Sequence, residues 1–173
     1  MLGKSYLYVL VFILSLQSVY CQSSSKFSFS AGPGLQTIIS KDLTVFGGFI
    51  GAGFDLNEDL NRWHVNVLAT KFSTRPLGEE INSFRGWSSN LQIGRIWTTG
   101  MEVNQHKVQL GGGIQGVFNF HQRQYNMPGF GAYFKVLIPI LTLNNQKPVY
   151  LMFEPSYFGD GIIRNFLGLN YRL

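Results

Sequence analysis

Eight stretches of alternating polarity run through this 173-residue chain, and their lengths constrain its fold more than any other feature. Clusters of Gly, Asn, Asp and Pro separate them, as turns separate strands. Most have 11 to 13 residues. A soluble strand commonly has about five or six residues, and a tilted strand that crosses a membrane has about nine to eleven. The lengths therefore favour membrane-crossing strands, which we predict at 26–38, 43–54, 62–72, 86–98, 106–120, 130–141, 148–158 and 162–173.

The two faces of each predicted strand differ in polarity. In 106–120, Leu110 and Ile114 share one face, whereas Gln109 and Gln115 share the other. Apolar side chains from eight strands would overfill a small barrel, while amides and charges suit its interior. We therefore expect the apolar face to point outward, towards lipid. The pattern predicts an all-β fold, an eight-stranded antiparallel up-and-down transmembrane β-barrel.

The amino-acid composition agrees with a lipid-facing surface. Charged residues make up 13% of the chain, about half the share that is usual in a soluble domain. The 14 basic and 9 acidic residues are scattered without runs, so the charge pattern does not support nucleic-acid binding.

Large aromatic residues lie near the ends of the predicted strands. If successive strands run antiparallel, these ends form two levels, like the aromatic girdles of membrane barrels. One level contains Trp63, Trp97 and Tyr171, and the other contains Trp87, Phe118, Phe120, Phe130 and Tyr157.

The first 21 residues have the features of an export signal. Lys4 precedes an apolar stretch at 6–16, which is shorter than the roughly 20 residues of a spanning helix. Cleavage before Gln22 would leave a barrel domain at 22–173. Lipid attachment to Cys21 is a competing interpretation, but Tyr20 stands where a small residue is normally required. A retained N-terminal anchor helix is the other alternative.

With this architecture in view, the chain resembles the small outer-membrane β-barrel proteins of the Bacteroidota. The likeness rests on a signal that ends just before Gln22, on the eight alternating stretches, and on a final strand that alternates apolar residues at Leu167, Leu169 and Tyr171. In that group the last residue is more often Phe, whereas here it is Leu173. The resemblance implies a bacterial outer-membrane location and carries over no catalytic or binding residue.

Sequence motifs for cofactors and metals find little support. The segment 111–116 matches the glycine pattern of a nucleotide-binding loop, but it lies inside a predicted strand and opens no helix. The histidines, His64, His106 and His121, lie on different stretches without neighbouring carboxylates or thiolates. We therefore predict no cofactor and no metal, and expect these histidines to bind water.

An enzymatic role is the first alternative. Some small outer-membrane barrels are lipid A hydrolases with a His-x-Ser pair, because the serine hydroxyl needs an imidazole beside it. No histidine of this chain has serine two residues later, and we predict no catalytic residue.

Charged residues with inward parity are the strongest residue-level candidates. Lys135, Glu154 and Arg164 lie on three successive predicted strands. A carboxylate between two cations is favourable in a narrow interior, and Arg172 could join them. We expect a polar network in the lumen that fills the barrel rather than a selectivity element, because eight strands leave room only for side chains.

These observations favour a structural or interaction role. The segments at 73–85 and 122–129 are expected outside the cell, with lipopolysaccharide, other membrane lipid or a protein as partner. Their exposed candidates are Arg75, Glu79, Glu80, Arg85, Arg123 and Tyr125. A soluble lipocalin-like carrier of a hydrophobic ligand is the second alternative, and it would place the apolar face inside.

Overall fold

The computed structural model describes residues 26–39, 42–56, 60–72, 87–119, 129–143, 147–159 and 161–173. The predicted signal peptide at 1–21, Cys21 and the outer-loop candidates lie outside these residues. So do His121 and Phe120, and the side chains of Trp87 and Phe118.

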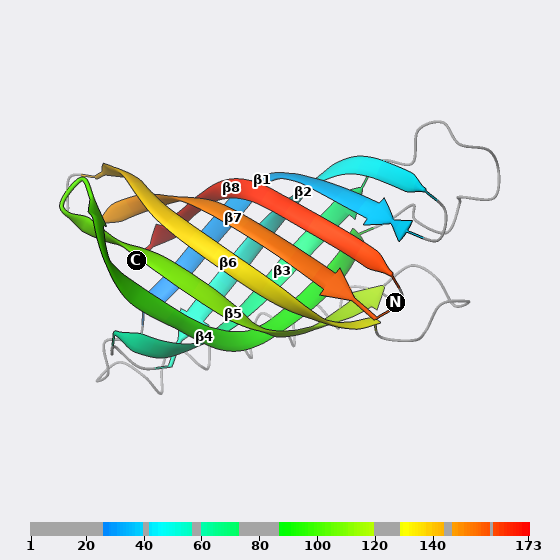
Figure 1. Ribbon diagram of the computed structural model, residues 1–173, viewed down its shortest axis with the longest axis horizontal. Coiled ribbons are helices and arrows are strands. Elements are labelled where there is room, and N and C mark those ends of the chain that lie inside the picture. The colour runs from blue at the N-terminus through cyan, green and yellow to red at the C-terminus, as the bar shows by residue number, and fades with distance from the viewer. Residues whose placement is uncertain are drawn as a thin grey trace, which may run out of the picture.

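The described chain is a closed antiparallel barrel in which every strand pairs with its neighbours in sequence and the last pairs with the first (Figure 1). This confirms the predicted fold. The strands are β1 (Lys26–Ile38), β2 (Leu43–Asp55), β3 (Asn61–Phe72), β4 (Trp87–Val103), β5 (His106–Asn119), β6 (Gly129–Thr142), β7 (Pro148–Phe158) and β8 (Ile162–Arg172). The terminal end is the end at which β1 begins and β8 ends, and the other is the opposite end.

Strand β4 differs most from its prediction. The link at 99–105 was expected to be a loop, yet β4 continues to Val103 and β5 begins at His106. Asn104 and Gln105 have φ of 51° and 64°, the left-handed values of a tight hairpin turn. A register shift between Thr98 and Glu102 absorbs the extra residues. A bulge of this kind makes the alternation of side chains irregular, which explains why the sequence pattern did not predict the part of β4 after residue 98.

The apolar face points outward, as the alternation predicted. The exposed fraction is 69% for Ile114 and 46% for Phe134, whereas Gln109 and Gln115 are buried. The structure therefore fits lipid outside the barrel and does not fit the lipocalin-like alternative, which needs its apolar face inside. At the terminal end, Trp63 and Trp97 are exposed on this outer surface. The described residues include no helix that is long and apolar enough to span a membrane.

The interior is only partly polar, which corrects the expectation that amides and charges line it throughout. Large apolar side chains are buried there as well, and many of them rest on glycines of adjacent strands. A Cβ added at Gly34 would lie 2.7 Å from the Phe166 ring, and one added at Gly47 would lie 2.7 Å from the Phe72 ring. Glycine thus makes room inside a barrel that is narrow enough for side chains to fill.

Candidate functional site: the buried polar network of the barrel

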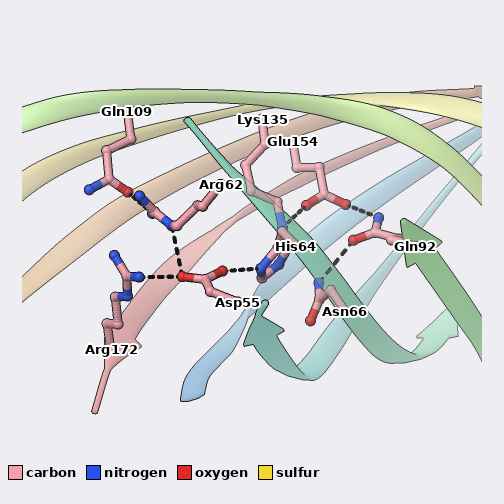
Figure 2. Close-up of polar contacts among 9 residues, drawn as sticks. All are labelled: Asp55, Arg62, His64, Asn66, Gln92, Gln109, Lys135, Glu154 and Arg172. Atoms are coloured by element: carbon pink, nitrogen blue, oxygen red, sulfur yellow. Dashed lines mark hydrogen bonds and ion pairs between the residues drawn. The ribbon is translucent and has the colours of Figure 1, made fainter. Parts of the chain in front are cut away.

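The centre of the barrel holds an ion pair between β6 and β7. Lys135 Nζ lies 2.9 Å from Glu154 Oε2, and both side chains are almost completely buried. Gln92 of β4 donates from Nε2 to Glu154 Oε1 at 2.5 Å, and Asn66 of β3 donates to Gln92 Oε1 at 2.9 Å. Figure 2 shows this chain of contacts across the lumen. Glu154 is thus paired through Oε2 and hydrogen-bonded through Oε1, which are the two conditions that a buried charge needs.

A second carboxylate, Asp55, organises the terminal end. Arg62 Nε donates to Asp55 Oδ2 at 2.7 Å, and Arg172 forms an ion pair with the same oxygen. The other oxygen, Oδ1, lies 2.7 Å from His64 Nδ1. Arg62 also donates to Gln109 Oε1 at 2.6 Å. These five residues form the Asp55 cluster, visible on the left of Figure 2.

Arg164 of β8 binds amide side chains towards the opposite end of the barrel. Its Nε donates to Gln36 Oε1 at 2.7 Å, and its Nη1 donates to Asn90 Oδ1 at 3.0 Å. Its guanidinium carbon lies 5.0 Å from the centre of the Phe158 ring and 5.4 Å from that of Phe72. The cation is therefore held by amide oxygens and by aromatic faces.

The structure thus brings together only part of the predicted network. Lys135 and Glu154 are paired, whereas Arg164 donates to Gln36 of β1 and Asn90 of β4. Arg172 binds Asp55 rather than Glu154. Asp55 and Arg62 were missed because each lies at the edge of a predicted strand, where a short polar stretch reads as the start of a turn.

Two histidines, His64 and His106, have protein partners where water was expected. His64 binds Asp55, and His106 Nε2 lies 3.0 Å from Thr142 Oγ1 at the rim. The described residues contain no group of three or more His, Cys, Asp or Glu that could hold a metal ion. The glycine motif at 111–116 lies within β5. A Cβ at Gly113 would lie 2.2 Å from the Ile93 carbonyl oxygen, so this glycine serves a close approach of backbones.

One arrangement in the lumen has the composition of a hydrolytic triad. Ser28 lines the same cavity as His64 and Asp55. A Cβ at Gly53 would touch both the Ser28 hydroxyl and the His64 ring, at 2.6 and 2.5 Å. No hydrogen bond joins Ser28 to His64 in this described part of the barrel, and the cavity is just large enough for about one water. A nucleophile needs its base within hydrogen-bond reach and a place for the substrate. The geometry provides neither.

The described residues define a class of protein: a closed eight-stranded barrel with an apolar outer face and a filled, charged interior. Among solved structures, the chain is similar to the crystal structure of Neisserial surface protein A (NspA), with a TM-score of 0.59 and 13% sequence identity. The match covers 87% of this chain and 97% of that one, and at this identity it shows the fold. No protein-family model matches the chain, and no curated protein matches it. The resemblance to Bacteroidota barrels stays a prediction.

Proposed function

We propose that this protein is a bacterial outer-membrane β-barrel with a structural or interaction role. One observation carries the proposal: large apolar side chains cover the outside of the barrel, while the Lys135–Glu154 ion pair and the Asp55 cluster are buried inside it. The exposed fraction is 70% for Phe130, 62% for Phe46 and 57% for Ile50, whereas Glu154 is completely buried. Water would disfavour this distribution and lipid favours it. Its likeness in fold to NspA and the predicted export signal support the same location.

The filled interior argues against a role as an open channel. The Asp55 cluster occupies the terminal end, and the side chains of Phe72, Phe158 and Phe166 are buried towards the opposite end. An eight-stranded barrel is just wide enough for side chains to fill it. We therefore propose that any partner binds from outside, at the segments 73–85 and 122–129 or at the lipid-facing surface. Lipopolysaccharide, phospholipid and a protein are the proposed partners.

We infer that the protein is not an enzyme. The lipid A hydrolase alternative needs a serine beside an imidazole, and the only such neighbours in the described chain, Ser28 and His64, make no hydrogen bond and face a cavity of one water. Mass spectrometry of lipid A from cells that make the protein tests this inference. Unchanged acylation is expected, and a loss of acyl chains that requires His64 would overturn it.

A charge placed on the outer face tests the membrane proposal. We expect Ile114→Arg to destabilise insertion by about 2–4 kcal/mol, because the side chain would face hydrocarbon. Val103→Arg is the matched control, since Val103 pairs with His106 next to the turn of the β4–β5 hairpin, at the rim of the barrel. The measurements are detergent-dependent extraction from cells and the heat-sensitive gel mobility of the folded barrel. Free solubility of the wild-type protein, with an Ile114→Arg variant of unchanged stability, would contradict the proposal.

Conductance tests the closed interior separately. Wild-type protein reconstituted into planar lipid bilayers is expected to produce no stable conducting steps. A steady ionic current that persists in the purified, correctly folded protein would show an open path through the lumen and refute the structural role.

A further inference from the structure

A small cavity inside the barrel adjoins both of its charged groups. Asp55, Arg62 and Arg172 line it from the Asp55 cluster. Lys135 of the central ion pair lines it as well, and Figure 2 shows these side chains. The cavity has room for about one water molecule. Because the Arg172 side chain is 17% exposed, the cavity lies next to the open terminal end of the barrel, where a small ion can enter from water.

Several polar groups that line this cavity have hydrogens without an acceptor in the described part of the chain. Ser28 and Asn170 are buried, and their side chains make no hydrogen bond there. The Tyr150 hydroxyl accepts a hydrogen bond from an amide at 3.0 Å, while its own hydrogen has no acceptor. Lys135 carries three N–H donors, and Glu154 accepts one of them. Buried polar groups normally have partners, so the cavity suits a ligand that accepts hydrogen bonds.

The charges around the cavity favour an anion over a neutral ligand. Three cations line it, Arg62, Lys135 and Arg172, and Asp55 is the only carboxylate among the described residues that do so. Both oxygens of Asp55 already have partners within the cluster, Arg62 at Oδ2 and His64 at Oδ1. A water molecule must donate hydrogen bonds as well as accept them. An anion only accepts them, and it is also attracted by the positive side chains.

We propose that this cavity is a binding site for chloride, a monovalent anion that occupies about as much space as a water molecule. Lys135, Tyr150 and Asn170 supply the hydrogen-bond donors, and phosphate or sulfate is too large for the space. Because donors from both charged groups line the cavity, the ion connects the Asp55 cluster to the central pair. The site goes beyond the proposed function, since it lies in the lumen and does not require lipid outside the barrel.

The stability of the purified barrel in detergent micelles tests the site, with chloride as the probe. The wild type is expected to unfold at a higher temperature in sodium chloride than in sodium gluconate of equal ionic strength, because a ligand of the folded state stabilises it. Tyr150→Phe should raise the chloride concentration needed for half of this effect about tenfold, since a charge-assisted hydrogen bond is lost. Tyr133→Phe is the matched control: Tyr133 is also buried in the lumen but does not line the cavity. Equal unfolding temperatures of the wild type in the two salts would overturn the site.

Crystals of the barrel soaked in sodium bromide locate the ion. Bromide replaces chloride and scatters X-rays anomalously, so the wild type is expected to show an anomalous peak within the cavity. Ser28→Val replaces a hydroxyl in the lining by two methyl groups and should abolish the peak. Ser30→Val should keep it, because Ser30 is buried on the same face of β1 without lining the cavity.

The result that overturns the site is a cavity that holds water without an anomalous signal, or bromide peaks confined to the outer surface. Heat-sensitive gel mobility shows whether each variant is folded, and Tyr150→Phe keeps the test decisive if Ser28→Val does not fold. A failure of the chloride site leaves the membrane proposal standing, because that proposal concerns the outer face of the barrel.

Discussion

The two ends of the barrel interior are filled by different chemistry. At the terminal end, the Asp55 cluster holds three strands together by charge: Asp55 on β2 binds Arg62 on β3 and Arg172 on β8. At the opposite end, the phenylalanine cluster packs rings from β2, β3 and β8. Its members are Phe49, Phe72 and Phe166. The ring centres of Phe49 and Phe166 are 4.8 Å apart.

The difference shows that an eight-stranded barrel can fill its lumen in two ways. Ring packing stabilises through apolar burial, which does not depend on salt. A charge cluster stabilises the fold only while every partner is present, because a buried charge without a partner is destabilising. Arg164 makes both kinds of contact. Amide oxygens accept hydrogen bonds from its N–H groups, and the Phe158 and Phe72 rings lie against its guanidinium.

Removing a ring should have the largest effect. Phe166→Ala is expected to lower the free energy of unfolding by about 4 kcal/mol, because Phe166 is completely buried and a cavity would remain. Leu167→Ala is the control, since Leu167 lies on the outer face of the barrel and is 48% exposed. Urea unfolding in lipid vesicles measures both. Equal losses in the two variants would show that the phenylalanine cluster is not a packed core.

Breaking the central pair should cost slightly less. Glu154→Gln leaves Lys135 buried without its carboxylate, and we expect a loss of about 3 kcal/mol in the same unfolding assay. Adding Lys135→Met should recover most of that loss, because the unpaired charge is removed. A double variant as unstable as the single one would mean that the pair stabilises through its packing rather than through its charge.

Two neighbouring glycines differ in the space around them: backbone lies close to Gly113, whereas Gly112 has only ordinary contacts. Gly113→Ala is expected to destabilise the barrel by about 2 kcal/mol, since its new methyl would press on the Ile93 carbonyl. Gly112→Ala, one residue away, should change stability by less than about 0.5 kcal/mol. Thermal unfolding followed by circular dichroism distinguishes them, and a reversed order would show that the strands do not approach as described.

The smallest effect is expected at the rim of the Asp55 cluster. The Arg172 side chain is 17% exposed, so Arg172→Gln should cost only about 1 kcal/mol at low salt. That cost should shrink in about 1 M salt, where the screening length falls to roughly 3 Å. The cost of Glu154→Gln should change little, because its charges are buried. Equal salt sensitivity would contradict the difference in burial.

The architecture could be predicted from the sequence because it rests on period-two alternation. The bounds of β1 and β7 match the predicted 26–38 and 148–158. Alternation also assigned the faces of Ile114 and Gln115 correctly, since a strand turns successive side chains to opposite sides. The extension of β4 was missed because a bulge interrupts this period.

The polar contacts could not be predicted in the same way. The alternation of side chains places Lys135, Glu154 and Arg164 inside the barrel, but it does not specify how far along the barrel axis each side chain lies. Because the strands of a barrel are tilted and offset in register, that offset decides which residues of neighbouring strands lie side by side. Arg164 therefore meets Gln36 and Asn90, which are distant in sequence. The pairing of Asp55 with Arg172 joins β2 to β8 and depends on closure, which no local pattern encodes.

The contact between β1 and β8 has a consequence for the order of assembly. The two strands pair at Ala31 with Leu169 and at Gly34 with Phe166, with no pairs between these positions. A Cβ at Gly32 would lie 2.1 Å from the Leu167 carbonyl oxygen, and one at Gly168 would lie 2.3 Å from that of Ala31. The first and last strands meet only after the rest of the chain has been laid down. A methyl group at either glycine would therefore block the last step of assembly, the pairing of β1 with β8. The sheet would then be nearly complete but would keep two unpaired edge strands, which can pair with another copy of the chain.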